Sequence, residues 1–397
     1  MDNNEFKGSI GIDFDKDVFV NDICITFENH YKNNAYFQLL CKKEGISPEN
    51  IGGIEDLAKL PFISTDLFKK SKGYFPKLLL VQMSEIAAWT LSSATSGDPS
   101  IIGRSTQDIK AYVESHKLMA SKYAPYSTDE SYMFLPHPLV LDGTTPGEIY
   151  GKPCFPYIAR TIESWGSTHD DDKYKHYLLQ PNPITNAIEL NIKPLIDMLN
   201  GGETNSIILI GGSVPLLFLS LRNIINNISH PPKFGDRLFV QVAAGGWDGK
   251  KGSINIGTAI VKKDFIQLLM ELFGIPLGNI TDGYGSSETS FICGGTYDPG
   301  VEDFIYKSPG WGRIIVRDPK TFEPVYEAGK QGMPQFITPY GVESFIGMSL
   351  LMNDLVEIVD YTPEKDGGTG LRFRVVGRLS TAKTVGCGAS IARMVEG

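Results

Sequence analysis

The middle of the chain alternates between short, continuous apolar runs and longer stretches in which apolar residues recur every three or four positions. A short apolar run is typical of a buried strand, and the longer spacing is typical of a helix with one buried face. The pattern predicts strands over 206–210, 237–244 and 279–284 and helices over 214–228 and 261–273. Regular alternation of strands and helices indicates a parallel sheet flanked by helices, in which ligands bind beyond the carboxyl ends of the strands.

The regions on either side follow other patterns. Apolar spacing predicts helices over 25–40 and 106–123, a helix beginning at Ser64, and strands over 86–91 and 131–135. From residue 311 onward, short β runs separated by Pro, Gly and Asp turns occupy 312–316, 335–338, 356–360 and 371–376, which indicates antiparallel sheet. We therefore predict an α/β fold with parallel and mixed sheets flanked by helices. Its parts are a core over 1–310, a β-rich subdomain over 311–376 and a short tail over 377–397.

Composition narrows the class of protein. The 397 residues carry a formal net charge of −9, which opposes general nucleic-acid binding because phosphate contacts require a basic surface. The acidic start of the chain does not resemble a signal peptide, and the longest apolar stretch, 207–219, is too short and interrupted to span a bilayer. Five scattered cysteines without a C-x-x-C motif indicate reduced thiols and a cytoplasmic protein.

A loop of small, hydroxyl-bearing residues follows the predicted strand 86–91. Its candidate phosphate-binding residues are Ser92, Ser93, Thr95, Ser96 and Gly97. Because these residues have little bulk, their backbone N–H groups and hydroxyls can surround a phosphate. The loop lacks the Lys-Ser/Thr ending of a Walker motif, which excludes an ordinary P-loop. A surface turn rich in turn-forming residues is the alternative.

A second motif ends the predicted strand 279–284 and reads Tyr284-Gly285-Ser286-Ser287-Glu288. A carboxylate after a tight, hydroxyl-rich turn at a strand end is well placed to hold Mg²⁺ against phosphate oxygens. The alternative is a helix start, with Ser286 as the cap and Glu288 in the first turn.

Two charged residues near the end of the chain complete the set. Asp354 precedes an apolar β run and can accept two hydroxyl donors, as ribose recognition requires. Arg378 leaves the predicted strand 371–376 and can reach a ribose or a phosphate. In isolation, a turn aspartate and a solvated arginine are the alternatives.

In this order, the four pieces resemble the adenylate-forming enzymes, which include acyl-CoA synthetases, adenylation domains and luciferases. The resemblance implies that the hydroxyl loop closes over ATP phosphates, that Tyr284 stacks on adenine, and that Glu288 holds Mg²⁺. It also implies that Asp354 binds the ribose and that Gly377-Arg378 marks a hinge. The turn Gly245-Gly246-Trp247 is then expected beside the adenine, and His137, in Leu135-Pro136-His137, beside the acyl pocket.

The chain departs from that superfamily in its loop, which lacks the usual second glycine and terminal lysine, and in ending soon after Gly377-Arg378. A mobile domain with a catalytic lysine normally follows there, and we expect the short tail to replace it. One branch, the LuxE family of acyl-protein synthetases, is similar to this truncated arrangement over about residues 60–390. The matching segments are 62–69, the Ser92 loop, 209–212, 245–247, 264–270, 378–381 and 386–387.

The LuxE resemblance implies that a cysteine near the C-terminus takes the acyl group from the adenylate, and here that position is Cys387. A thiolate is the reactive form, and Lys383 is a candidate for lowering the pKa of Cys387. The alternative is that Cys387 is an inert tail cysteine. An acyl reductase or a carrier protein is the expected partner.

The sequence thus predicts an ATP- and Mg²⁺-dependent ligase that converts a carboxylic acid, fatty or aryl, to an acyl-adenylate and passes the acyl group to Cys387. One alternative is an adenylating enzyme of the phenylacetate-CoA ligase type, which would pass the acyl group to CoA, a carrier protein or an amine. Another is a nucleotide-binding relative that no longer catalyses.

Overall fold

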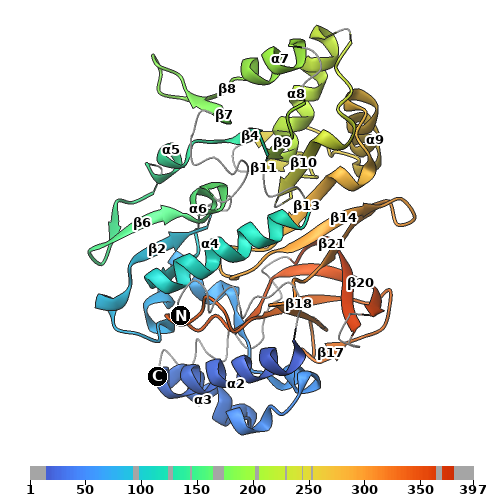
Figure 1. Ribbon diagram of the computed structural model, residues 1–397. Helices are drawn as coiled ribbons and strands as arrows, with labels where there is room; N and C mark the ends of the chain where they lie inside the picture. Colours follow the sequence, from blue (N-terminus) through green and yellow to red (C-terminus); the bar gives the residue numbers. More distant parts are fainter. Residues whose placement is uncertain are drawn as a thin grey trace.

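The computed structural model describes residues 15–92, 98–123, 128–143, 145–163, 174–201, 205–228, 230–243, 245–251, 254–363 and 369–379. Over these residues the strands form one sheet of 15 strands, a second sheet of four and a third of two. Figure 1 shows the large sheet running through the molecule, with the N-terminal helices at one end and α7, α8 and α9 at the other.

Five neighbouring strands of the large sheet run parallel and form its α/β half. They lie in the order β13 (Ile280–Tyr284), β10 (Leu238–Ala243), β9 (Ile208–Gly212), β4 (Glu130–Pro136) and β7 (Lys175–Pro181). The strands predicted from apolar runs in this region are confirmed, with small shifts at their ends. Because the strands are parallel, their carboxyl ends meet at one edge of the sheet, where Tyr284 ends β13.

The other half of the large sheet is mostly antiparallel, as the β runs after residue 311 predict. Its strands are β14 (Cys293–Asp298), β15 (Asp303–Lys307), β16 (Arg313–Arg317), β17 (Pro324–Val325), β18 (Gln331–Ile337), β19 (Ser349–Leu351), β20 (Asp354–Pro363) and β21 (Thr369–Arg378), with β1 (Ile63–Ser64) at this edge and β8 (Ile188–Leu190) at the other. Strand β15 pairs with β21, so one sheet continues across residue 310.

The smaller sheets carry the connections around the site. The four-stranded sheet has the order β3 (Ile101–Arg104), β2 (Ala88–Leu91), β6 (Lys152–Pro156) and β5 (Glu148–Ile149), and β11 (Lys250–Lys251) pairs with β12 (Ile254–Asn255). Strands β2 and β3 lie on either side of the hydroxyl loop. Their pairing is antiparallel and joins Leu91 to Ile101, so it brings the two ends of that loop together.

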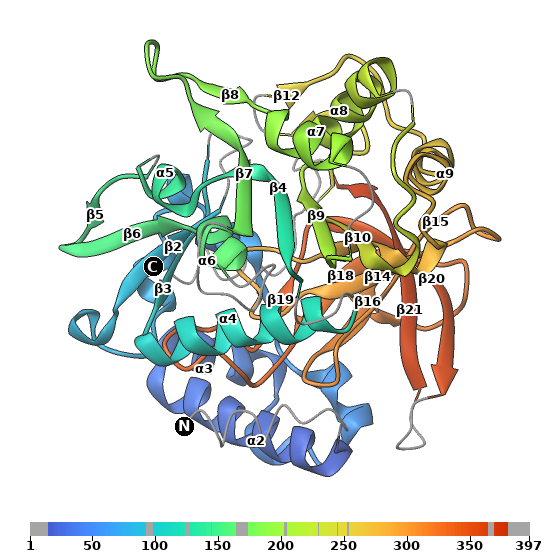
Figure 2. The same cartoon turned by 45° about the horizontal axis from the view of Figure 1, so that its top comes forward.

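Helices cover the parallel strands on more than one side. Helix α4 (Thr106–Ser121) crosses one face, whereas α8 (Val214–Asn227) and α9 (Lys262–Phe273) lie together on another side (Figures 1 and 2). The Ser105 hydroxyl caps α4 by accepting the Asp108 N–H at 3.1 Å, as polar N-cap residues commonly do. The remaining helices are α5 (Pro138–Asp142), α6 (Tyr157–Glu163) and α7 (Lys193–Asn200).

The region 25–40 is helical as predicted except at Asn34, but it belongs to two helices, α2 (Lys16–Asn33) and α3 (Ala35–Glu44), and not to one. Asn34 separates them in an extended conformation, and its side chain accepts hydrogen bonds from the N–H groups of Tyr36 and Phe37. The apolar spacing continues through the break, so the capping residue, rather than the spacing, ends the helix. The helix predicted at Ser64 is a 3₁₀ helix over Thr65–Phe68.

Short 3₁₀ helices fill the remaining connections: Pro48–Asn50, Ile54–Lys59, Lys70–Lys72, Phe75–Leu78, Met83–Glu85, Gly235–Arg237 and Leu277–Asn279. A continuous apolar core runs from α2 and α3 through the sheet to α8 and α9. Within the described part of the chain, no helix combines the length and apolar character that crossing a membrane requires.

Candidate active site

Three predicted site residues from separate parts of the chain meet inside the large sheet, where β13 and β21 end and β20 begins. The Tyr284 hydroxyl, at the end of β13, donates a hydrogen bond to Asp354 Oδ2 at 2.9 Å. The Arg378 guanidinium donates through Nε to Asp354 Oδ1 at 3.1 Å. Asp354 begins β20 and Arg378 ends β21, and the two are direct partners in the strand pairing. The structure therefore brings these three side chains together, as the sequence predicts.

Burial differs sharply within this group. The Arg378 side chain is 73% exposed, whereas that of Asp354 is 13% exposed. Tyr284 is buried against the rings of Tyr306, Phe336 and Phe373. Burial raises the pKa of the Tyr284 phenol well above its ordinary value, so this hydroxyl stays protonated and donates to the carboxylate.

The segment after Tyr284 is a loop, and no helix begins there. Its bends lead directly into β14, which pairs antiparallel with β13. The alternative in which Ser286 caps a helix is therefore wrong. Instead, Ser286 N–H donates to Thr289 Oγ1 at 3.2 Å, and the Ser287 hydroxyl donates to Glu288 Oε2 at 3.0 Å. Glu288 is only 5% exposed, so this turn holds its carboxylate inside the molecule.

A buried arginine, Arg104, which no motif in the sequence singles out, supports the Glu288 loop. The guanidinium is fully buried and donates to the Ser287 carbonyl at 3.1 Å, the Ser290 hydroxyl at 3.3 Å and the Gly341 carbonyl at 3.2 Å. Burial lowers the pKa of Arg104, while the negative charges of Asp108 and Glu288 oppose that shift. Arg104 thus provides a buried positive charge that interacts with the negative charge of Glu288.

The glycine turn after β10 lies at the same edge of the sheet. Gly245 and Gly246 adopt φ values of 78° and 94°, a left-handed conformation that favours glycine. The Trp247 indole then turns inward, packs against Phe265 and Phe304, and donates to Asp282 Oδ2 at 3.1 Å.

Asp282 is a second buried charged group outside the motifs predicted from the sequence. Its Oδ2 also accepts the Tyr306 hydroxyl at 2.8 Å, whereas its buried Oδ1 has no hydrogen-bond partner among the described residues. Burial raises the pKa of Asp282 to about 6, although Tyr306, Trp247, Lys262 and Lys251 act in the opposite direction. Burial likewise lowers the pKa of Lys251 to about 8. A carboxyl group inside an apolar strand, as in Ile280–Tyr284, is the sequence signal that identifies such a position.

Asp282 is expected to make the stability of the protein fall as the pH rises from about 4 to about 6. Its folded-state pKa of about 6 lies above the ordinary value of 3.8, so between these values the folded protein binds more protons than the unfolded chain. Asp282→Asn removes the titration and keeps an oxygen that accepts hydrogen bonds. The free energy of unfolding of the variant minus that of wild type should therefore increase by roughly 1–3 kcal/mol between pH 4 and pH 7, because each unit of pKa difference is worth about 1.36 kcal/mol.

Urea unfolding of both proteins across this pH range measures the difference. Asp197→Asn is the matched control, because the Asp197 side chain is exposed and its difference from wild type should stay constant. A difference for Asp282→Asn that does not change with pH would contradict the assignment.

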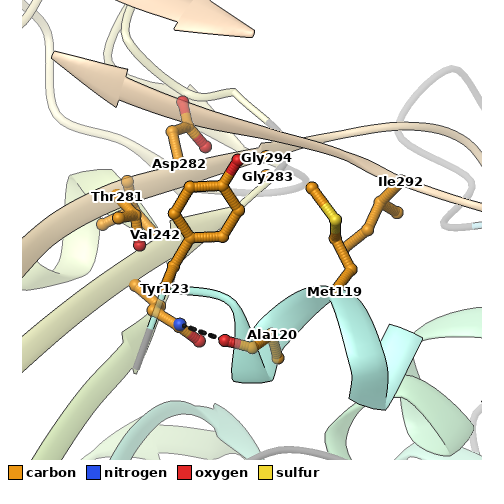
Figure 3. A pocket seen from close by; sticks show the side chains of 10 residues that line it. Met119, Ala120, Tyr123, Val242, Thr281, Asp282, Gly283, Ile292 and Gly294 are labelled. Carbon is orange, nitrogen blue, oxygen red and sulfur yellow. Dashed lines mark hydrogen bonds between the residues drawn. The ribbon is translucent and has the colours of Figure 1, made fainter. Parts of the chain in front are cut away.

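A pocket lies between α4 and the strands of the large sheet (Figure 3). It is on the α4 face, whereas the hydrogen bonds to the Asp282 carboxylate are on the other face. It is lined by Met119, Ala120, Tyr123, Gln241, Val242, Thr281, Asp282, Gly283, Ile292 and Gly294. Gly283 precedes Tyr284 in β13, but the Tyr284 side chain lies on the other face of the sheet, where it packs against Tyr306 and binds Asp354. Neither His137 nor Trp247 is among the described residues that line it.

His137 occupies a separate position, at the start of α5. Its Nδ1 accepts the Leu139 N–H at 3.2 Å, and its ring packs edge-on against Tyr177 with the centroids 4.7 Å apart. The described contacts of His137 are therefore with α5 and β7, and the expected position of His137 beside an acyl pocket stays a prediction.

The ends of the hydroxyl loop are described, whereas its centre is not. Ser92 N–H donates to the Ser100 carbonyl at 3.0 Å, and Ser100 N–H donates to Ser92 Oγ at 2.8 Å. The predicted residues Ser93, Thr95, Ser96 and Gly97 lie outside the described residues, as do Lys383 and Cys387.

Comparison with known proteins identifies the family. The model of the family "Acyl-protein synthetase, LuxE" matches residues 9–395. The chain belongs to the LuxE acyl-protein synthetase family. It is therefore an ATP-dependent ligase, and its general reaction is the activation of a carboxylic acid as an acyl-adenylate.

Two curated relatives and a solved structure extend this result. The chain is 25% identical to a long-chain-fatty-acid–luciferin-component ligase of Aliivibrio fischeri over 377 residues, which cover 93% of this chain and 86% of the relative. It is 31% identical to a phenylacetate-coenzyme A ligase of Thermus thermophilus over 86 residues, covering 21% of this chain and 18% of the relative.

An open conformation of 2-hydroxyisobutyryl-CoA ligase in complex with 2-HIB-AMP and CoA superposes with a TM-score of 0.58 at 13% identity. The match covers 92% of this chain and 76% of that one. This similarity confirms the predicted α/β fold of an adenylate-forming ligase.

The described site residues fit a bound nucleotide. Each oxygen of Asp354 accepts one hydrogen bond, and a carboxylate oxygen offers two lone-pair positions, so both can also accept a ribose hydroxyl. Apart from the chain neighbours of Gly245, no heavy atom of the described residues lies within 4 Å of where a Cβ would stand on it, which leaves this backbone open. The Glu288 carboxylate is the hard oxygen ligand that Mg²⁺ prefers.

Proposed function

We propose that the protein adenylates a carboxylic acid at the carboxyl ends of β10 and β13 and then transfers the acyl group to Cys387 as a thioester. The observation that carries the adenylation site is the joining of Tyr284, Asp354 and Arg378 by two hydrogen bonds, with Glu288 four residues after Tyr284 on the adjoining loop. Bound ATP supplies the adenylyl group and the pyrophosphate leaving group that carboxylate activation requires.

The proposed roles follow from the chemistry of each side chain. Asp354 accepts the ribose hydroxyls, and the exposed guanidinium of Arg378 reaches a phosphate. Glu288 holds Mg²⁺, and the Ser92 loop surrounds the phosphates. Positioning and charge stabilisation are the contributions that these residues make to in-line attack by the acid.

The pocket beneath α4 is the proposed site for the tail of the acid. It is lined largely by apolar atoms and by the flat surfaces of Gly283 and Gly294. Gly283 lines this pocket near the carboxyl end of β13, so an acid bound there would direct its carboxylate toward the strand ends at which the nucleotide is proposed to bind.

The state of the other cysteines supports Cys387 as the acyl acceptor. Burial raises the pKa values of Cys24, Cys41, Cys154 and Cys293, to about 12 for Cys41. A thiol is a nucleophile only as the thiolate, so these four are poor acceptors. In the proposed step a Cys387 thiolate attacks the carbonyl carbon of the acyl-adenylate. The thioester bond forms, the bond from the acyl carbon to the phosphate oxygen breaks, and AMP leaves.

Intact-protein mass spectrometry after incubation with MgATP and a panel of acids tests this proposal. The panel runs from acetate to palmitate and includes benzoate and phenylacetate. We expect an acyl adduct that hydroxylamine removes and that Cys387→Ala abolishes. Cys24→Ala is the matched control, because Cys24 is the one partly exposed thiol among the described residues, and it should retain the adduct.

The same experiment separates a second candidate function, favoured by the local similarity to a phenylacetate-coenzyme A ligase. Pyrophosphate release with no adduct would mean that the acyl group passes to a free acceptor such as CoA, a carrier protein or an amine. If Cys387 carries the adduct, an acyl reductase is the proposed partner that consumes the thioester. Nucleotide binding without pyrophosphate release for any acid would overturn both functions.

A further inference from the structure

The glycine turn after β10 is the base of a hairpin formed by β11 and β12, which pair antiparallel. Backbone hydrogen bonds fix this hairpin to the turn. The Gly249 N–H donates to the Gly246 carbonyl at 2.9 Å, and the Ile260 N–H donates to the Trp247 carbonyl at 2.7 Å. A Cβ built on Gly249 would overlap the Thr258 carbonyl oxygen, so the two sides of the hairpin base pack closely. The hairpin backbone is therefore held in a fixed position relative to the turn.

Lys251 reaches from this hairpin to the end of β10. Its Nζ donates to the Ala243 carbonyl at 2.8 Å, and Ala243 is the last residue of that strand. The ammonium group therefore lies at the carboxyl end of β10, where the proposed function places the adenylation reaction. The neighbouring Lys250 is exposed, whereas Lys251 is partly buried, as expected when consecutive residues of a strand point to opposite faces.

The surroundings of the Lys251 ammonium favour a bound anion. Burial lowers the pKa of Lys251 to about 8, and the negative charge of Asp282 reduces this shift without cancelling it. Asp282 directs Oδ2 to the Tyr306 hydroxyl and the Trp247 indole, and its Oδ1 accepts no hydrogen bond from the described residues, Lys251 included. The amine stays mostly protonated at pH 7, because that pH lies below its pKa. A further anion beside it would offset the cost of burying its charge.

The proposed reaction needs a cation for the acid, because it brings a carboxylate against an anionic nucleotide and like charges repel each other. Two other cations near the site already have acidic partners. Lys262 forms an ion pair with Asp303, and Arg378 forms one with Asp354, where the ribose is proposed to bind. These contacts favour Lys251 as the cation that receives the acid.

We propose that Lys251 binds the carboxylate of the acid and holds it at the carboxyl end of β10 for attack on the nucleotide. A carboxylate oxygen then forms a bond to the α-phosphorus of ATP, and the bond from that phosphorus to the pyrophosphate oxygen breaks. The ammonium keeps its proton throughout and acts through its charge and its hydrogen bonds. This inference rests on the proposed function and adds to it the residue that recognises the acid.

The kinetics of acid-dependent ATP–pyrophosphate exchange test this role. Lys251→Met should raise the KM for the acid by roughly 10- to 100-fold, the scale of one hydrogen bond between charged groups. It should leave the KM for ATP within a few-fold of wild type. Lys250→Met is the matched control, because it removes an exposed lysine from the same hairpin, and both of its KM values should follow wild type. Lys251→Arg keeps the charge and should recover part of the acid affinity.

Thermal unfolding with Mg²⁺ and α,β-methylene-ATP, which cannot release pyrophosphate, gives a readout that does not depend on catalysis. The probes are the acid of the panel that most raises the wild-type melting temperature and the primary alcohol with the same carbon skeleton, which carries no charge. In wild type the acid should raise the melting temperature more than the alcohol does, whereas in Lys251→Met the two should act alike. If Lys251→Met does not fold, Lys251→Gln serves as the neutral variant in both measurements.

The alternative is that Lys251 only balances the buried charge of Asp282. The double variant that combines Lys251→Met with Asp282→Asn removes both charges and separates the two roles. If Lys251 only balances Asp282, the double variant should regain the wild-type KM for the acid, and this result would overturn the inference. If Lys251 binds the acid, that KM should stay as high as in Lys251→Met.

These outcomes are distinct from those that test the proposed function. An unchanged KM for the acid in a folded Lys251→Met protein, or equal rises in the KM values for the acid and for ATP, would overturn the role of Lys251 and leave the proposed adenylation intact. Absence of exchange with every acid in wild type would reject the proposed function. In that case the comparison of acid with alcohol still decides whether Lys251 binds a carboxylate.

Discussion

Glu288→Gln is expected to lower the rate of acid-dependent ATP–pyrophosphate exchange by about 100-fold or more, the scale on which single electrostatic groups act in active sites. Glutamine has the same shape and still accepts the Ser287 hydroxyl, which lies 3.0 Å from Glu288 Oε2. It removes the negative charge that is proposed to hold Mg²⁺. It also leaves the positive charge of Arg104 without this nearby counter-charge. The loss should therefore appear in the chemical step and in the Mg²⁺ requirement.

Exchange measured across a range of Mg²⁺ concentrations, together with thermal unfolding, checks this result. The matched control is Glu357→Gln, which neutralises a carboxylate on β20 that is paired with Arg374 at 3.0 Å. The control should keep its exchange rate within a few-fold of wild type. Near-normal exchange by a folded Glu288→Gln protein would reject the metal role of this residue.

Local sequence patterns predict the central parallel strands well because β9 and most of β10 and β13 are buried on both sides. Strands β9, β10 and β13 appear as apolar runs, and helices α8 and α9 show regular apolar spacing between them. The pattern fails at Asn34, where the spacing continues across a break that a side-chain cap produces. Capping by one residue leaves the periodicity unchanged, so apolar spacing alone does not reveal where one helix ends and the next begins.

The site was predicted in part, and the division has a physical reason. The joining of Tyr284 to Asp354 follows from an ordered set of motifs, although 70 residues separate the two in the chain. The contacts of Arg104 give no such signal, because it binds Ser290 and Gly341, which lie 186 and 237 residues further along. Tyr123 follows helix α4, and no sequence pattern indicates that its ring packs on Gly294, 171 residues further along the chain. Tertiary contacts of single residues decide these roles.

The buried Arg104 is expected to be among the most important residues for stability. Arg104→Met should lower the free energy of unfolding by about 3–5 kcal/mol, the range for removing one partner from a buried charged network. The change removes the guanidinium donor from the Ser287 carbonyl, at 3.1 Å, and from the Gly341 carbonyl, at 3.2 Å; the Gly341 carbonyl keeps the Ser290 hydroxyl as a donor. It also removes a guanidinium that stacks between the rings of Tyr112 and Phe345.

Urea unfolding with matched arginine variants tests the size of this effect. Arg372→Met is the control. Arg372 forms ion pairs with Asp298 and Asp360, and its side chain is 24% exposed. Ion pairs that solvent can reach contribute about 0–1 kcal/mol to stability. Arg104→Lys should recover little of the loss, since an ammonium lacks the planar fork that reaches several acceptors at once. Because Arg104 holds the loop that carries Glu288, any folded Arg104→Lys protein should also need more Mg²⁺ for exchange. Equal losses in Arg104→Met and Arg372→Met would show that Arg104 does not hold these strands and this loop together.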